Sequence, residues 1–180
     1  YLEREMFPWA LKQHRSLFDL RDHCTEQRGI VIPTGREYFK FAVHIIRAVR
    51  QVFNSSLPIE VHYIGRGDLD PEHLQLLSKL GVRTVDITEI FDNSILELKG
   101  WDIKPFAMLA SRFREVLMMD ADTVFMQPPE AFFADDGYRE TGALFFHDRT
   151  LFPTDQHKQD WIASMLTKPL SKAVLASRYY

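Results

Sequence analysis

Two carboxylates near the middle of the chain are the residues best suited to chemistry. Asp120 and Asp122 follow a short apolar run, residues 115–119, which is too short for a helix and is typical of a buried strand. Alternate side chains of a strand point the same way, so we expect both aspartates to face one ligand. At about 5 Å they would repel by roughly 3 kcal/mol at an effective dielectric of 20, which a cation between them would remove. Oxygen ligands of this kind suit Mn²⁺ or Mg²⁺.

The same spacing recurs at Asp68 and Asp70, where it predicts a different role. Asp70 precedes Pro71 and a helical pattern of leucines, so we expect an N-cap followed by proline at the first helical position. For Asp120 and Asp122 the spacing alone also fits an acidic strand end that faces water. Their sequence context has to decide between a metal site and that alternative.

Length and composition are typical of one globular domain. The 180 residues are 46% hydrophobic and 13% aromatic, enough for a substantial core. The net charge of −3 is spread over mixed signs, and no basic block is interleaved with aromatics, so nucleic acid is not an expected partner. No apolar run is long enough to predict a membrane span. The start at Tyr1 and the end in mid-pattern at Tyr180 predict a segment of a longer protein.

Strand-like and helix-like patterns alternate along the chain after a helical lead-in at residues 1–27. We expect strands at 29–33, 59–64, 82–87, 115–119 and 142–146, and helices at 36–53, 71–80 and 105–113. This alternation predicts an α/β fold with a mostly parallel sheet and helices on both faces. Ligands of such sheets bind outside the carboxyl ends of the strands.

Three turns follow predicted strands and should therefore meet at that edge. They are Pro33-Thr34-Gly35-Arg36, Gly65-Arg66-Gly67 and Asp120-Ala121-Asp122. Each alone is an ordinary turn, and the second lacks the third glycine of a dinucleotide-binding fingerprint. Together they predict a nucleotide pocket.

Lys104 stands where the sequence predicts the beginning of a helix. Pro105 disfavours helical geometry at Lys104 and so places it beside the free amides of residues 106–108. The positive end of the helix dipole opposes a cation there by up to about 1 kcal/mol unless an anion is also present. A diphosphate would supply that anion. The alternatives are a solvated lysine and local neutralisation by Asp102.

The order of these motifs resembles the fungal α-mannosyltransferases of glycosyltransferase family 71. The resemblance covers roughly residues 28–166 and is carried by residues 29–33, 57–63, 100–125, 129–130 and 138–149. It implies a GT-A fold, GDP-mannose as donor, and Mn²⁺ as cofactor with Mg²⁺ as a substitute. It also implies a Golgi membrane protein with a lumenal catalytic domain, which builds cell-wall mannan and glycoprotein outer chains.

The resemblance assigns roles to the central motifs by position. Asp120 and Asp122 match the metal-binding pair, with Asp122 the more direct ligand and Asp120 reaching the metal or the donor ribose. Lys104 matches a basic residue suited to the donor diphosphate. Ala121 lies between the two aspartates in the same donor-binding turn.

The other site residues that the resemblance implies lie near the beginning and the end of the similar region. Pro33, Thr34, Gly35 and Arg36 stand where this fold cradles the nucleotide. Asp148 and Arg149 match an Asp-Arg pair near the donor sugar, for which a salt bridge that closes a turn is the alternative.

The implied reaction is retaining transfer of α-mannose from GDP-mannose to a mannose hydroxyl of a glycoprotein or mannan acceptor, with α-1,3 favoured over α-1,2 linkage. The metal would neutralise charge on the departing diphosphate. Residues 28–180 would form the donor-binding part of a truncated catalytic domain, and a Golgi transferase complex is a possible partner. Two alternatives stay open: another sugar-nucleotide enzyme, such as a nucleotidyltransferase, and a catalytically silent carbohydrate-binding or assembly subunit.

Overall fold

The computed structural model describes residues 7–8, 22 and 24–145. The chain divides into two compact units, residues 1–142 and 143–180, and every helix and strand given below lies in the first. Most of the predicted helical lead-in, residues 1–27, lies outside the described residues. Its last two residues, Glu26 and Gln27, belong to a strand. No helix within the described ranges is long and apolar enough to cross a membrane.

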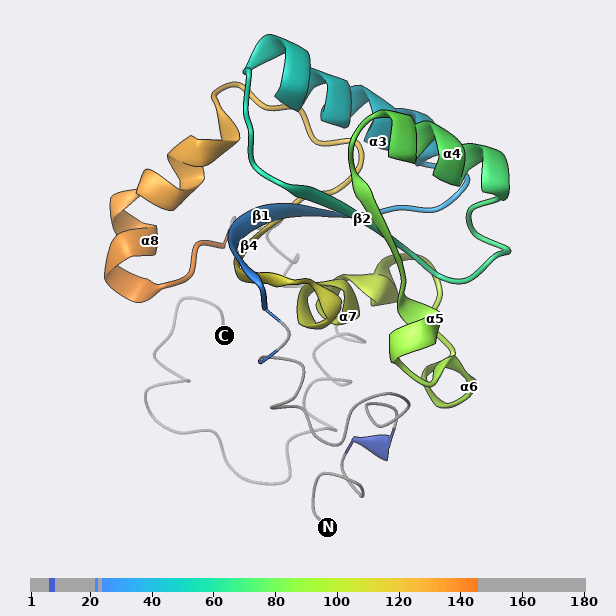
Figure 1. The fold of residues 1–180 in the computed structure, drawn as a ribbon. Helices are drawn as coiled ribbons and strands as arrows, with labels where there is room; N and C mark the ends of the chain where they lie inside the picture. Colours follow the sequence, from blue (N-terminus) through green and yellow to red (C-terminus); the bar gives the residue numbers. More distant parts are fainter. Residues whose placement is uncertain (1–6, 9–21, 23, 146–180) are drawn as a thin grey trace, which may run out of the picture. The chain divides into compact units, whose positions relative to one another are not determined.

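A four-stranded sheet forms the centre of the first unit (Figure 1). Its strands, in the spatial order β3-β2-β1-β4, are all parallel, which confirms the predicted α/β class. The strands are β1 (Glu26–Pro33), β2 (Ile59–Tyr63), β3 (Arg83–Asp86) and β4 (Phe113–Met118). Their carboxyl ends therefore lie at one edge, as the alternation of elements predicted.

Strand β1 begins earlier than its apolar run suggested because its polar start pairs with β4. Glu26 lies opposite Phe113 and Arg28 opposite Glu115 in the parallel register. The Arg28 Nε–H also donates to the Glu115 carboxylate at 2.9 Å. Cross-strand pairing thus extends the strand beyond the residues that hydrophobicity alone identified.

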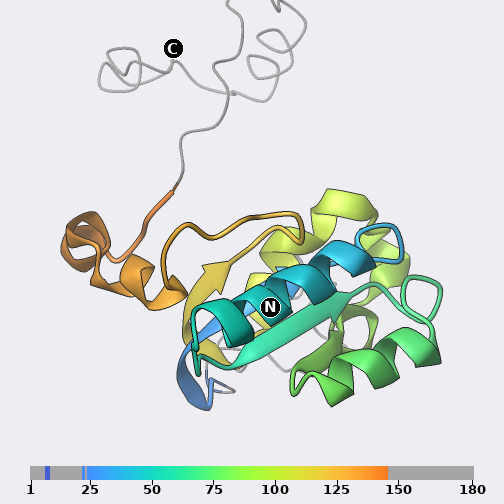
Figure 2. The same ribbon diagram turned by 90° about the horizontal axis from the view of Figure 1, so that it is seen from above.

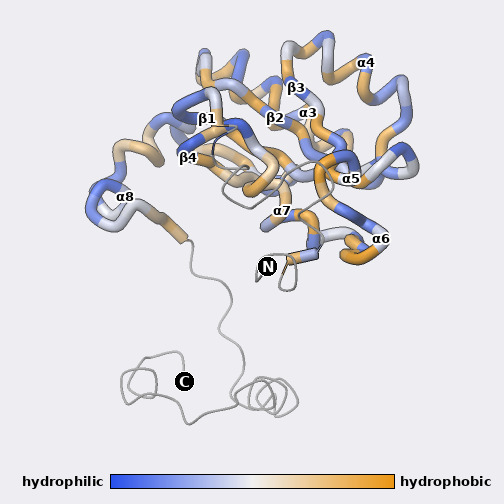
Figure 3. The backbone as a smooth tube through the Cα atoms, turned by 60° about the horizontal axis from the view of Figure 1, so that its bottom comes forward, coloured by the Kyte–Doolittle hydropathy of each residue, from blue (hydrophilic) through white to orange (hydrophobic). Residues whose placement is uncertain are grey.

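Helices cover both faces of the sheet. Helices α3 (Phe39–Arg47) and α4 (Pro71–Lys79) lie on one face, and α7 (Ile103–Ala110) lies on the other (Figure 1 and Figure 2). Ile30 and Ile32 pack on the first side, whereas Val31 packs with α7. Figure 3 shows a hydrophobic stretch in the second half of β1, between hydrophilic segments, and alternating polarity along α4. The run Ile30-Val31-Ile32 of β1 is apolar without interruption because both of its faces are covered.

The helix predicted at residues 36–53 is shorter and changes its winding. Residues 36–38 form a turn, α3 follows, and the segment Ala48–Val52 (η2) continues it as a π-helix. The predicted polar stripe of this segment is confirmed, because its members are all exposed: Glu37, Lys40, His44, Arg47 and Gln51.

The predicted cap of α4 is confirmed. The Asp70 carboxylate accepts a hydrogen bond from the backbone N–H of His73 at 3.1 Å, and Pro71 occupies the first helical position. That hydrogen bond, with the nearby charges of His73 and Arg36, lowers the pKa of Asp70.

The stretch between β3 and α7 contains three short helices where the sequence predicted irregular structure. They are α5 (Ile87–Ile90), α6 (Asn93–Leu96) and the 3₁₀ turn η3 (Gly100–Asp102). Because η3 leads directly into α7, the helix begins at Ile103, and Lys104 and Pro105 both lie in its first turn. Proline is tolerated there because the first amides of a helix have no intrahelical partner. The predicted start at Pro105 was therefore two residues late.

The strand predicted at residues 142–146 is absent from the part that the structure describes. The 3₁₀ segment η4 (Pro129–Ala134) leads instead into helix α8 (Asp136–Thr141). Gly142, with φ of 75°, ends this helix in the left-handed conformation that glycine tolerates best. Residues 143–145 carry no strand, and Phe146 lies outside the described residues.

A charged cluster is buried at β2, on the face of the sheet that α7 covers. Glu60 and His62 are fully buried, and the His62 Nε2–H donates to the Glu60 carboxylate at 3.1 Å. The Arg83 guanidinium lies 2.9 Å from the same carboxylate, and the Arg112 backbone N–H donates to it at 3.4 Å. Burial raises the pKa of Glu60, but the hydrogen bond and charge of His62, together with Arg83, outweigh it, so the pKa lies below its ordinary 4.5.

Replacing this carboxylate should destabilise the fold. We expect Glu60→Gln to lower the free energy of unfolding by about 2 kcal/mol, because buried donors lose their charged acceptor. A carboxyl with a lowered pKa adds stability above its unfolded-state value, and this stability is lost as pH falls through the folded-state pKa. The difference between wild type and variant should therefore shrink below about pH 4.5.

Urea unfolding monitored by circular dichroism at pH 7 and pH 4 measures both effects. Glu140→Gln, an exposed change on α8, serves as the matched control and should be close to neutral. Equal stability of Glu60→Gln and wild type at pH 7 would contradict the expectation.

Candidate functional site

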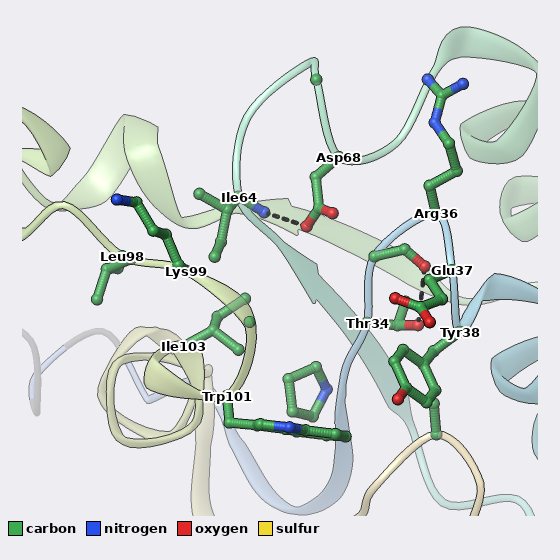
Figure 4. Close-up of a pocket in the computed structure, with 15 residues that line it drawn as sticks. Thr34, Arg36, Glu37, Tyr38, Ile64, Asp68, Leu98, Lys99, Trp101 and Ile103 are labelled. Atoms are coloured by element: carbon green, nitrogen blue, oxygen red, sulfur yellow. Dashed lines mark hydrogen bonds between the residues drawn. The ribbon is translucent and has the colours of Figure 1, made fainter.

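A cavity of about 600 Å³ lies at the carboxyl edge of the sheet (Figure 4). The predicted turns after β1, β2 and β4 all contribute to its wall, so the structure brings them together as the sequence indicated. A fourth segment, residues 98–103, completes the lining. The lining residues are Pro33, Thr34, Gly35, Arg36, Glu37, Tyr38, Ile64, Gly67, Asp68, Leu98, Lys99, Gly100, Trp101, Ile103 and Ala121.

The turn after β1 is held close to the loop after β2. Thr34 is buried, and its backbone N–H donates to the His62 carbonyl at 2.9 Å, which continues the pairing of the two strands. The next residue, Gly35, lies so near Asp68 that an added Cβ would overlap the Asp68 carboxylate. Glycine is therefore needed here for close approach.

Asp68 was missed as a site residue by sequence reasoning. It was grouped with Asp70 as part of a helix cap, yet only Asp70 caps the helix. The Asp68 carboxylate accepts the Ile64 backbone N–H at 3.0 Å and lines the cavity. Its position five residues after a buried strand, in a loop with two glycines, was the available signal.

Arg36 lies at the rim of the cavity. Its side chain is 62% exposed, and its guanidinium lies 3.7 Å from the Asp70 carboxylate. Figure 4 shows it extending away from Thr34 and Tyr38. Of the four residues expected to cradle a nucleotide, Pro33, Thr34 and Gly35 face the cavity through the turn itself, whereas the charged end of Arg36 is directed elsewhere.

An aromatic pair forms part of the wall and was also missed by sequence reasoning. The rings of Tyr38 and Trp101 lie 5.4 Å apart at an angle of 56°. Trp101 is 53% exposed, which is high for a side chain that is usually largely buried. The signal in the sequence was a tryptophan in an otherwise polar, irregular stretch.

Lys104 and Asp120 form an ion pair next to this wall. The Lys104 Nζ lies 2.7 Å from Asp120 Oδ1 and 4.7 Å from the centre of the Trp101 ring. Asp120, and not Asp102, is thus the acid that neutralises Lys104. Since both side chains are more than a third exposed, the pair adds at most about 1 kcal/mol to stability.

The two aspartates do not share the alternation of a strand. Strand β4 ends at Met118, and a turn follows in which the Thr123 backbone N–H donates to the Asp120 carbonyl at 3.0 Å. Asp122 is exposed and, within the described part of the chain, makes no ion pair or side-chain hydrogen bond. Ala121 between them is buried and lines the cavity. The premise that a strand period aligns Asp120 and Asp122 was therefore wrong, although both follow the strand end.

The carboxylates in the described ranges offer at most a partial metal site. No group of three or more histidine, cysteine, aspartate or glutamate residues there could hold an ion. Asp120 and Asp122 supply exposed oxygen ligands, which fit an ion that keeps water or phosphate as further ligands. The remaining predicted site residues, Asp148 and Arg149, lie outside the described residues.

Comparison with known proteins identifies the family. A family model described as "Mannosyltransferase putative" matches residues 27–175. The chain is 28% identical to "Putative alpha-1,3-mannosyltransferase MNN14" of Candida albicans over 92% of its length, and 28% identical to "Probable alpha-1,3-mannosyltransferase MNT4" of Saccharomyces cerevisiae over 72%. It is also 29% identical to "Alpha-1,2-mannosyltransferase MNN2" of Saccharomyces cerevisiae over 69% of its length.

These alignments cover 28%, 24% and 22% of the respective relatives, so the chain spans about a quarter of their length. The family match, in contrast, covers most of this chain and includes every element of the cavity described above. The chain therefore belongs to the mannosyltransferase family that this model describes.

Proposed function

We propose that this chain forms the donor-binding part of a metal-dependent enzyme that transfers α-mannose from GDP-mannose to a mannose hydroxyl. The observation that carries the proposal is the Lys104–Asp120 ion pair and the free Asp122, which flank a cavity at the carboxyl ends of parallel strands. In open α/β sheets, ligands bind at this edge. Membership of a mannosyltransferase family supports mannose as the transferred group.

Asp120 and Asp122 are the proposed ligands of Mn²⁺ or Mg²⁺. Both carboxylates reach solvent, and hard oxygen ligands with open coordination positions suit these ions. When bound, the ion would stabilise negative charge on the leaving diphosphate. Asp122 is the more available of the two, because Asp120 already pairs with Lys104.

Lys104 is the proposed contact of the donor diphosphate. Lys104 lies in the first turn of α7, the positive end of the helix dipole, where an anion is favoured. Asp120 holds the Lys104 ammonium in place at 2.7 Å, so the positive charge is already oriented before an anion arrives. A charge that is already in position lowers the activation barrier of the transfer, because the side chain need not rearrange during the reaction.

Linkage, acceptor and location are proposed from the relatives and the resemblance. Two of the relatives above are named α-1,3-mannosyltransferases and one is named an α-1,2-mannosyltransferase, so we favour an α-1,3 linkage. A mannose-terminated glycan is the acceptor that fits this chemistry. A Golgi membrane location with a lumenal catalytic domain, and association with a transferase complex, follow only from the resemblance.

Removing the free carboxylate should abolish most transfer. In the full-length protein we expect Asp122→Asn to lower the rate of mannose transfer from GDP-mannose by about 100-fold or more. The variant would hold the metal ion poorly, so the negative charge that develops on the leaving diphosphate would lose its stabilising partner. Transfer of radiolabelled mannose to a mannobiose acceptor measures the effect. Asp136→Asn, which changes a fully exposed aspartate on α8, is the matched control and should be neutral. Near-normal activity of Asp122→Asn would defeat the assignment.

Nucleotide binding should depend on the metal even when no transfer occurs. We expect GDP with Mn²⁺ to raise the melting temperature of the full-length protein, since a ligand at 100 times its Kd stabilises by about 2.7 kcal/mol. GDP alone or Mn²⁺ alone should do much less, and Asp122→Asn should remove the dependence on Mn²⁺. Differential scanning fluorimetry gives the shift.

The same titration tests the alternative of a catalytically silent subunit. Absence of any GDP- and Mn²⁺-dependent shift in the full-length protein would favour a carbohydrate-binding or assembly role. An equal shift with and without Mn²⁺ would contradict metal-dependent binding.

A further inference from the structure

The part of the cavity between Trp101 and Asp68 is the strongest unassigned feature of the described residues. Figure 4 shows Trp101 and Asp68 on opposite sides of an open space. Ile64 and Ile103 lie along one flank, and Thr34 and Tyr38 lie along the other. None of Tyr38, Asp68 and Trp101 was expected in the site from the sequence, and the diphosphate chemistry proposed above uses none of them.

The charges that face the space between Trp101 and Asp68 do not favour an anion there. The acidic side chains Glu37 and Asp68 line it. The two basic lining residues, Arg36 and Lys99, both extend away from the space between Trp101 and Asp68 in Figure 4. Lys104, the cation proposed for the diphosphate, is not among the lining residues. The wall therefore suits a flat, uncharged group that carries hydrogen-bond donors.

We propose that Tyr38, Trp101 and Asp68 form the nucleobase subsite and that Asp68 selects guanine. The inference rests on the proposed function, because it takes the ligand to be the nucleotide whose diphosphate meets Lys104. It adds the part of the site that distinguishes one sugar nucleotide from another.

The aromatic pair supplies a stacking surface. Trp101 is half exposed on the wall of a cavity large enough for a nucleoside, and Tyr38 supports it at 5.4 Å. An aromatic face stacks on any nucleobase, because every base has a π-face. Trp101 and Tyr38 therefore give affinity for a base without choosing among bases.

Asp68 supplies the selectivity for guanine over other bases. An ionised carboxylate only accepts hydrogen bonds and has about four acceptor positions on two oxygens. The Ile64 backbone N–H occupies one of them on Oδ2, which orients the group and leaves others free. Guanine presents N1–H and the 2-amino group side by side, a pair of donors that matches a carboxylate. Uracil offers one N–H between two carbonyls, and adenine offers a donor next to an acceptor.

The absence of a side chain at Gly35 is what allows the Asp68 carboxylate to lie where it does. Any side chain at position 35 would overlap the Asp68 carboxylate. Gly35 leaves room for the Asp68 carboxylate, and the Ile64 N–H orients this carboxylate before a base enters. Preorganisation of this kind raises affinity because less freedom is lost on binding.

Calorimetric titration of the full-length protein in the presence of Mn²⁺ tests the base preference directly. We expect wild type to bind GDP at least about tenfold more tightly than UDP or inosine diphosphate, since inosine lacks only the 2-amino group. Inosine diphosphate is the sharper comparison because its ring stacks like guanine. Equal affinity for GDP and inosine diphosphate would overturn the role of Asp68.

Asp68→Asn provides a reciprocal test. Its amide oxygen can still accept the Ile64 N–H, while its amide nitrogen becomes a donor. Affinity for GDP should fall about tenfold or more, and affinity for xanthosine diphosphate, which has a carbonyl in place of the 2-amino group, should rise above that for GDP. If Asp68 had only a structural role, Asp68→Asn would bind both nucleotides more weakly by the same factor. That result would overturn the proposal. If this variant does not fold, the wild-type comparison of GDP with inosine diphosphate decides.

Trp101→Ala tests the stacking surface. We expect Trp101→Ala to lower the affinity for GDP, UDP and inosine diphosphate by a similar factor of about tenfold. Trp101→Phe should recover most of this lost affinity. Unchanged affinity in Trp101→Ala would overturn the aromatic part.

The wild-type titration separates this inference from the proposed function. No binding of any nucleoside diphosphate with Mn²⁺ would defeat the proposed function itself. Nucleotide binding without preference for guanine would leave that function standing and defeat only the base subsite. Mannobiose binding that is lost in both Asp68→Asn and Trp101→Ala, and that GDP does not displace, would assign the space to a sugar and overturn the inference.

Discussion

The parallel pairing of β1 with both β2 and β4 is the constraint on which the rest of the structure depends. Ile30 lies opposite Ile59 on one side and Leu117 on the other, so one buried strand sets the register of both neighbours. Because the strands run the same way, the turns that follow them end at one edge. The cavity wall, from Pro33 to Ala121, exists because of this pairing.

Burial on both faces explains why few polar residues lie in the centre of the sheet, and why the buried carboxylate among them has charged partners. Glu60 is the main exception on β2, and His62, Arg83 and Arg112 surround its carboxylate. A buried charge without such partners would be very costly. Among the described residues, two buried nitrogens of this cluster have no hydrogen-bond partner: His62 Nδ1 and Arg112 Nε. The polar chemistry of the molecule therefore gathers at the sheet edge, where side chains reach water.

The site divides into two electrostatic regions. Lys104, Asp120 and the exposed Asp122 carry the groups suited to a cation and a diphosphate, whereas the cavity wall presents Asp68 and aromatic rings. Trp101 connects the two, because it lines the cavity and lies 4.7 Å from the Lys104 ammonium. A ligand with a neutral aromatic end and an anionic end would match both regions at once. Nucleoside diphosphates have this form.

The sequence by itself determined the parallel α/β class, the cap at Asp70 and the convergence of the three turns at one edge of the sheet. Each follows from a pattern that can be read within a short segment or from the order of such segments: hydrophobic periodicity, a capping residue, and the alternation of strands with helices. Only the tertiary structure decided that Lys104 pairs with Asp120 and that Asp68 and Trp101 line the same cavity. It also decided that Asp122 lies in a turn, where it has no side-chain partner within the described part of the chain. These contacts join residues far apart in the chain, or depend on where an element ends by one or two residues. Neither is encoded in local pattern, since packing against neighbouring segments sets both.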